Sequence, residues 1–167
     1  MLIISDTTPI ISLIKADKLY LLEKMFGNVI IPKAVYDELT VNEKYGKEIA
    51  ELKEAIFIKV GKVENNASVN ILRNVTGLDA GESEAIVMAE ENDADLLLMD
   101  EHKGRQVAKK LGIRITGTIG ILLQAFDEGM LSREDIVNSI VVLKESNIRI
   151  SDNLCKKVYE HIKTWNI

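Results

Sequence analysis

Short apolar runs that end in an acidic residue constrain the fold of this chain more than any other feature. Leu2, Ile3 and Ile4 precede Ser5 and Asp6, and the run 96–99 precedes Asp100. A short apolar run of this kind is typical of a buried parallel strand. Open α/β sheets bind ligands at the carboxyl ends of their strands. Asp6 and Asp100 are therefore expected at one ligand-binding edge.

Two further acids are placed to join them. Glu38 follows the apolar stretch 30–35, and Glu82 opens an apolar helix. We expect Asp6, Glu38, Glu82 and Asp100 to converge, although nearly a hundred residues separate the outermost pair. A pocket lined by carboxylate oxygens suits a hard divalent cation, Mg²⁺ or Mn²⁺.

Strands and helices are expected to alternate along the whole chain. The predicted strands are 1–5, 29–31, 56–60, 96–99 and 113–115. The predicted helices are 9–16, 18–26, one opened by Pro32, 44–53, 67–74, one from Asp79 to about Asn92, 103–111, 118–128, 132–144 and 151–165. Thr8 is the expected N-cap of the first helix, and Asp79 with Glu82 resembles a capping box. This alternation predicts an α/β fold with a parallel sheet covered on both faces.

Composition narrows the class of protein. A chain of 167 residues with 47% apolar residues is expected to form one domain, 1–167, with a core of its own. The single cysteine, Cys155, excludes a disulfide framework. No apolar stretch reaches the ~20 residues that span a bilayer, so we expect a cytoplasmic protein that does not associate with a membrane. The net charge of −5 gives no sign of nucleic-acid binding.

Several motifs together resemble those of PIN domains. They are Asp6-Thr7-Thr8, Val35-x-x-Glu38-Leu39, Gly81-Glu82-x-x-Ala85-Ile86 and Leu98-Met99-Asp100. A later run, Gly104-Arg105-x-x-Ala108, Gly112-Ile113 and 116–122, resembles one prokaryotic PIN branch. The resemblance covers about 2–131, and helices in 132–167 are expected to pack on that part.

The resemblance implies a fold, an activity and partners. PIN domains are typically three-layer α/β/α sandwiches with a central parallel sheet. Many are Mg²⁺- or Mn²⁺-dependent ribonucleases, including VapC-like toxins of VapBC-type toxin–antitoxin pairs, which implies an RNA substrate and an antitoxin partner. PIN-like proteins often dimerise, so a homodimer through apolar surface near Leu13, Leu19, Leu22 and Met25 is expected. Glu82 stands where the toxins usually carry Asp.

The chemistry of phosphodiester hydrolysis assigns roles to further residues. A bound cation neutralises charge on the transition state and lowers the pKa of a water molecule, so no nucleophilic Ser or Cys is needed. Thr7 or Thr8 is expected to orient Asp6 by hydrogen bonding its second oxygen. The cations expected to meet substrate phosphate are Lys103, Arg105, Lys109 and Lys110.

Plainer roles stay open for several of these residues. Asp6 and Asp100 could each cap the helix that follows it, Glu38 could be a solvated helix residue, and Glu101 fits an exposed charge near a cap. Glu84 is the fallback for Glu82, and Glu101 is a second fallback ligand. Trp165 is expected to anchor the C-terminal segment by packing.

Two other functions compete with the metal-dependent endoribonuclease. One is a non-catalytic RNA-binding or assembly module that keeps the PIN fold. The other is a phosphoacceptor domain, which needs an acidic pair early in the chain. Asp6 has no acidic neighbour, so the second is disfavoured.

Overall fold

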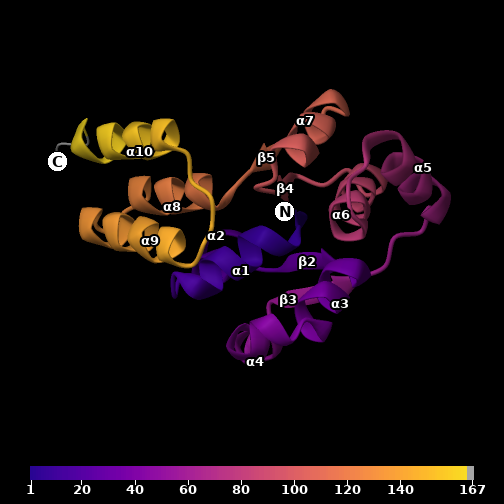
Figure 1. Cartoon of the computed structure of the whole chain (residues 1–167), viewed down its shortest axis with the longest axis horizontal. Helices are drawn as coiled ribbons and strands as arrows, with labels where there is room; N and C mark the ends of the chain where they lie inside the picture. The colour runs from indigo at the N-terminus through magenta and orange to yellow at the C-terminus, as the bar shows by residue number, and fades with distance from the viewer. Residues whose placement is uncertain (165–167) are drawn as a thin grey trace.

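A five-stranded parallel sheet forms the centre of the molecule (Figure 1). The structure is a computed structural model that describes residues 1–164. The strands are Ile3–Ser5 (β1), Val29–Pro32 (β2), Ile58–Gly61 (β3), Leu96–Leu98 (β4) and Ile115–Thr116 (β5). They lie in the order β3-β2-β1-β4-β5, and every neighbouring pair is parallel. The first strand is therefore the central one.

Helices connect the strands and cover both faces of the sheet. They are Thr7–Lys15 (α1), Tyr20–Phe26 (α2), Lys33–Val41 (α3), Gly46–Glu54 (α4), Asn66–Thr76 (α5), Ala80–Glu91 (α6), His102–Lys110 (α7), Thr118–Asp127 (α8), Arg133–Glu145 (α9) and Asp152–Thr164 (α10), with a 3₁₀ turn at Glu43–Tyr45 (η1). The predicted three-layer α/β/α fold is confirmed. Among residues 1–164, every helix is too short or too polar to traverse a lipid bilayer.

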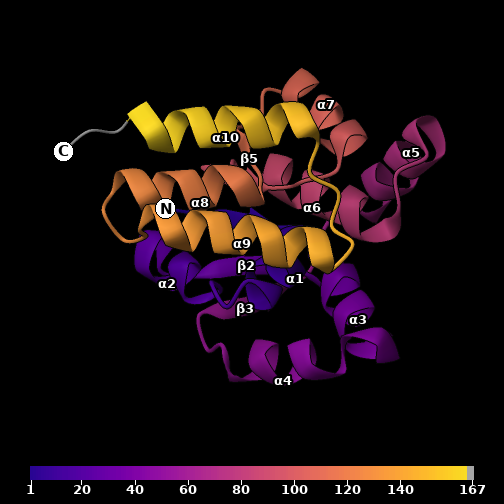
Figure 2. The same cartoon turned by 60° about the vertical axis from the view of Figure 1, so that its left-hand side comes forward.

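The pleat of the strands divides the core into two layers. Ile3 pairs with Val29 and Leu96, and this row faces the helices α1, α2, α8, α9 and α10. Ile4 pairs with Ile30 and Leu97, and this row faces α5, α6 and α7. Successive side chains of a strand point to opposite faces, so each apolar run serves both layers. Figures 1 and 2 show the two helix groups on opposite sides of the molecule.

Helix starts were predicted with mixed success. The predicted capping box at Asp79 with Glu82 is present, and a second one joins Ser132 and Asp135 at the start of α9. Thr8 as the first N-cap is wrong, because α1 begins two residues earlier than predicted, at Thr7, and Asp6 holds the N-cap position. The predicted anchor Trp165 lies outside the described residues.

The apolar surface expected on the early helices is not exposed. Leu13, Leu19 and Leu22 are buried, and Met25 is half-buried against the same core. The physical reason is that α1 packs against α8 and α9, and α2 packs against α8. The C-terminal half of the chain thus covers the face that was expected to mediate dimerisation, and this part of the prediction is wrong.

Substitution of Gly104 in α7, compared with substitution of Gly46 in α4, measures how tightly α7 packs on the sheet. A β-carbon at Gly104 would lie 2.5 Å from Sδ of the buried Met99, whereas one at Gly46 would meet open space. Gly104→Ala is therefore expected to lower the free energy of unfolding by about 1–3 kcal/mol through overpacking. Gly46→Ala, also in a helix, should raise that free energy by up to ~1 kcal/mol. Urea unfolding measures both, and equal effects of the two variants would contradict this packing.

Candidate active site

The centre of the sheet contains a topological switch point. The chain runs from β1 to β2 and β3 on one side and then crosses from β3 to β4 and β5 on the other, so the strand order reverses direction at β1. Such a point leaves a crevice at the carboxyl ends of the strands, where ligands bind in open α/β sheets. Asp6 follows β1, and its backbone N–H donates to the carbonyl of Leu98 at 2.9 Å. Asp100 comes two residues after β4, so both acids lie at this edge.

Gly81 is the point at which two of the acids meet. A β-carbon at Gly81 would lie 3.2 Å from Oε2 of Glu38 and 3.6 Å from Oδ1 of Asp6. Glu38 comes from α3, and Gly81 is the second residue of α6. The missing side chain leaves the two carboxylates facing the first turn of α6, which also carries Glu82.

Asp6 is the most perturbed of these carboxyls. Its side chain is only 3% exposed. Burial, together with the negative charges of Asp79, Glu82 and Glu38, raises the pKa of Asp6 from 3.8 to about 8, against the opposing effect of the Thr7 amide. Without a cation, Asp6 is thus protonated at neutral pH.

Glu82 belongs to the same electrostatic cluster. Burial raises its pKa, the Asp79 amide opposes the shift, and repulsion from Asp79, Glu101 and Glu38 adds to it. Its Oε2 accepts a hydrogen bond from the Asp79 N–H at 2.9 Å, which fixes the side chain in the capping box. Three acids from different helices and loops therefore repel one another around Asp6.

Asp100 is turned toward a different element. Its two oxygens accept hydrogen bonds from the N–H of Thr118 at 2.7 Å and from Thr118 Oγ1 at 2.5 Å, at the start of α8. Burial raises the pKa of Asp100, while the Thr118 hydrogen bonds and the Arg105 charge oppose the shift. In this arrangement Asp100 lies on the neighbouring strand but does not share the charge cluster of Asp6.

The two threonines after Asp6 have other roles than the one expected. Thr7 Oγ1 donates to Oε2 of Glu38 at 2.8 Å, so the Thr7 side chain orients Glu38, while the Thr7 backbone amide is the group that hydrogen bonds Asp6. Thr8 lines the depression next to Asp100. Both side chains still act at this edge, but neither donates to Asp6 within residues 1–164.

The plainer roles considered from the sequence hold in part, since Glu38 is an exposed helix residue, although its carboxylate accepts the Thr7 hydrogen bond. Asp6 makes no side-chain capping hydrogen bond in α1. Glu101, not Asp100, caps α7 by accepting from the Gly104 N–H at 2.7 Å. Glu84 accepts from the Ala34 N–H at 2.9 Å, which satisfies the start of α3. The fallback acids Glu84 and Glu101 therefore serve as helix caps here.

The four candidate cations of α7 are spread along the helix. Arg105 donates to the Met99 carbonyl at 2.8 Å and lies beside Asp100. Lys103 reaches the α5–α6 turn, where a β-carbon at Gly77 would lie 3.2 Å from its Nζ. Lys109 and Lys110 lie in the last turn, where α7 runs toward the start of β5 at the opposite edge. Only Arg105 lies directly at the acidic edge.

The carboxylates fit a hard cation by chemistry. Oxygen donors are what Mg²⁺ and Mn²⁺ prefer, and buried acids whose repulsion is uncompensated gain most from a bound positive charge. Within residues 1–164, however, no three His, Cys, Asp or Glu side chains are already arranged to hold a metal ion. Ligation would need Asp100 or Glu82 to change the hydrogen bonds described above.

Sequence reasoning missed two contributors. Asp79 raises the pKa of Asp6 although the sequence suggested only a cap, and its position three residues before Glu82 was the available signal. Thr118 holds both oxygens of Asp100, and only its place after Gly117 in the strand-to-helix turn pointed to the edge of the sheet.

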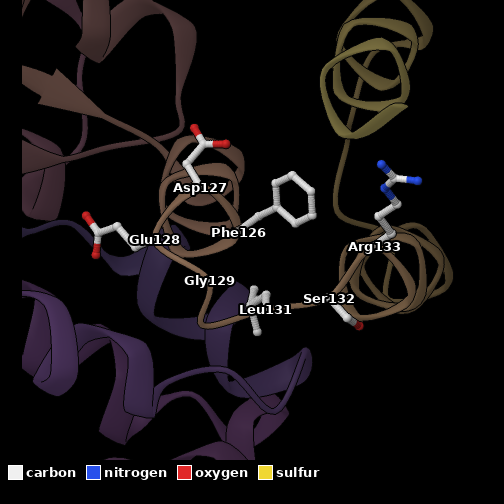
Figure 3. Close-up of a pocket in the computed structure, with 7 residues that line it drawn as sticks. All are labelled: Phe126, Asp127, Glu128, Gly129, Leu131, Ser132 and Arg133. Atoms are coloured by element: carbon white, nitrogen blue, oxygen red, sulfur yellow. The ribbon is translucent and has the colours of Figure 1, made fainter. Parts of the chain in front are cut away.

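A second depression lies away from these acids. It measures about 660 Å³ and is formed at the turn between α8 and α9 (Figure 3). Its residues are Phe126, Asp127, Glu128, Gly129, Leu131, Ser132 and Arg133. It is at the far end of α8 from Thr118, so it is no part of the candidate site.

Comparison with known families identifies the class of protein. A family model described as a PIN domain matches residues 2–164, so the chain belongs to the PIN-domain family. The match extends through α9 and α10, beyond the part that carries the motifs. PIN domains are generally nucleases, which favours a nuclease-type function for the acidic edge. Comparisons with curated proteins and with solved structures find no match.

The raised pKa of Asp6 makes stability depend on pH. The unfolded chain loses this proton near pH 3.8, whereas the folded chain keeps it until about pH 8. Between these values the folded state binds the extra proton, so the contribution of Asp6 to stability is lost as pH rises through this window. In EDTA, the melting temperature of wild type minus that of Asp6→Asn should fall from pH 5 to pH 8. A difference that is constant over this range would contradict the assigned burial.

Proposed function

We propose that the protein is a Mg²⁺- or Mn²⁺-dependent endoribonuclease that hydrolyses phosphodiester bonds of RNA. The observation that carries the proposal is the meeting of Asp6 and Glu38 at Gly81, with Glu82 in the next position, at the switch point of a PIN-domain sheet. Asp100 completes the set from the neighbouring strand. These four acids are the proposed catalytic residues and metal ligands.

Each residue has a role that follows from its surroundings. When bound, the cation would neutralise charge on the phosphate and lower the pKa of a water molecule. Asp6, Glu38, Glu82 and Asp100 would hold it, and Asp6 must give up its proton to do so. Thr7 fixes Glu38 through its Oγ1 hydrogen bond, and Thr118 fixes Asp100 through two. Arg105, anchored on the Met99 carbonyl, supplies a positive charge beside Asp100 for a substrate phosphate.

The proposed toxin role and its antitoxin partner rest on the family membership alone. A role as the toxin of a VapBC-type pair, with an antitoxin covering the acidic edge, is proposed from the PIN-domain membership. The homodimer, the cytoplasmic location and the treatment of 1–167 as one domain stay predictions. A dimer surface could not be built on Leu13, Leu19 and Leu22, since these side chains are buried.

Cleavage of pooled cellular RNA with Mn²⁺ tests the proposal. Asp6→Asn and Glu82→Gln should each lower the cleavage rate at least about 100-fold, because loss of a metal ligand exceeds the 10–100-fold cost of disturbing a ligand's supporting residue. Glu84→Gln is the matched control in the same helix. Its amide oxygen can still accept from the Ala34 N–H, so this variant should keep most of the activity.

The outcomes separate the competing functions. Equal rates for wild type and Asp6→Asn would show a contaminating nuclease. RNA binding without any metal-dependent cleavage would favour the non-catalytic binding module. If Glu84→Gln were inactive and Glu82→Gln active, the wrong face of α6 would have been assigned. Thermal melting of every variant checks that the fold is intact.

A further inference from the structure

A depression lies beside Asp100. Two adjoining hollows of about 650 and 630 Å³ share Asp100, His102, Arg149, Ile150 and Leu154. Each falls within the ~300–1,000 Å³ range of sites that hold small molecules or parts of larger ones. Thr8 and Thr118 line the inner hollow, so it is continuous with the acidic edge.

The connection between α9 and α10 forms the outer wall of this depression. Asn147 has a φ of 60°, which ends α9, and the N–H of Ile148 donates back to the Leu143 carbonyl at 3.0 Å. Asn tolerates this left-handed conformation better than most residues. Ser151 then starts α10 by accepting the Leu154 N–H at 3.1 Å. Figure 2 shows this connection rising from the end of α9 to the start of α10.

Charged side chains of both signs line this depression, and Arg149 is the cation on its outer wall. Arg149 is exposed and forms no ion pair or side-chain hydrogen bond within residues 1–164, so its charge is available. Arg105, which lies beside Asp100, lines the outer hollow together with Arg149, and His102 lines both hollows. The acids that line the hollows are Asp100 in both, Asp152 in the outer one and Glu101 in the inner one.

Apolar side chains form the remaining surface. Ile119 and Ile148 line the inner hollow, and Ile150 and Leu154 line both. Leu154 is 37% exposed although it is a large apolar residue. A surface that combines two arginines with aliphatic walls matches a nucleotide, which joins an anionic phosphate to a base with an apolar face.

We propose that this depression is a subsite for one nucleotide of a single-stranded RNA substrate, next to the scissile phosphate. Arg149 contacts the phosphate of that nucleotide, and Ile150 and Leu154 pack against its base. This proposal rests on the proposed ribonuclease function, and it adds the path that the RNA strand takes across the surface. RNA leaves the acidic edge past Asp100 and along the α9–α10 connection, rather than toward Lys109 and Lys110.

Binding of a short single-stranded RNA, measured by fluorescence anisotropy in EDTA on the Asp6→Asn background, tests the subsite without cleavage. Arg149→Ala should raise Kd about fivefold at 0.1 M salt and lower the salt slope by about 0.7, the effect of one lost phosphate contact on a single strand. Arg149→Lys should restore most of the binding. Asp152→Asn should tighten binding, since it removes an acid from the same wall.

Arg114→Ala is the matched control. Arg114 is also exposed, but it precedes β5 at the opposite edge of the sheet, so its loss should leave Kd unchanged. Equal effects of Arg149→Ala and Arg114→Ala, or a salt slope unchanged by Arg149→Ala, would overturn the subsite. Melting temperatures equal to that of the background protein show that both variants are folded.

Cleavage kinetics separate failure of the subsite from failure of the proposed function. With Mn²⁺ and otherwise wild-type protein, Arg149→Ala should raise KM and leave kcat nearly unchanged, because Arg149 touches the substrate away from the reacting atoms. If wild type cleaves RNA and Arg149→Ala has unchanged KM, the subsite is wrong and the ribonuclease stands. If wild type binds RNA through Arg149 but does not cleave it, the ribonuclease is wrong and the binding site stands.

Discussion

The parallel pairing of β1 between β2 and β4 is the constraint on which the rest of the structure depends. It places the first strand of the chain at the centre of the sheet and brings residues from the first and fourth strands to one edge. The register is fixed by apolar side chains that fill both faces, since a slip of one residue would exchange the two core layers. Asp6 and Asp100 therefore need no direct attraction to become neighbours across the strands. The sheet holds them there, and the helices after β2 and before β4 add Glu38 and Glu82.

This arrangement places the buried Asp6 carboxyl among other acids, with no positive group paired to it in the described part of the chain. The Asp6 carboxyl is surrounded by Asp79, Glu82 and Glu38, while the cations nearest the edge are held elsewhere: Arg105 lies beside Asp100, and Lys103 lies at the α5–α6 turn. A site of this kind is stable only when its central acid is protonated or when a cation is bound. Catalytic sites commonly show such unbalanced charge, because the groups that bind a ligand are the ones that repel one another without it. The proposed function is compatible with the net charge of −5. A bound cation would offset the negative charge of the acidic edge, and the exposed Arg149 would contact a substrate phosphate next to it.

The fold could be predicted from the sequence because its signals are local. Each apolar run of about four residues marks a strand, and both capping boxes mark the start of a helix by residues three positions apart. The details of the site could not be predicted in the same way, because they depend on contacts between distant segments. Thr7 donates to Glu38, which is 31 residues away, and Glu84 caps α3 from 50 residues away. The cover of α8 and α9 over α1, which overturned the expected dimer surface, is likewise a tertiary contact. Arg149 could not be placed at all, since a short connection between two helices gives no sequence pattern that points to the sheet edge.

Calorimetric titration with Mn²⁺ at pH 7, repeated in two buffers of different ionisation enthalpy, tests most directly whether the buried acids form a metal site. Because Asp6 is protonated at this pH without a cation, and a ligand must be deprotonated, binding to wild type should release about one proton per metal ion. Asp6→Asn should bind Mn²⁺ more weakly than wild type and release fewer protons. Asp135→Asn, which changes an acid of the α9 capping box, should bind Mn²⁺ as wild type does. Binding that is unchanged in Asp6→Asn, or no binding by wild type at millimolar Mn²⁺, would contradict a metal site built around Asp6.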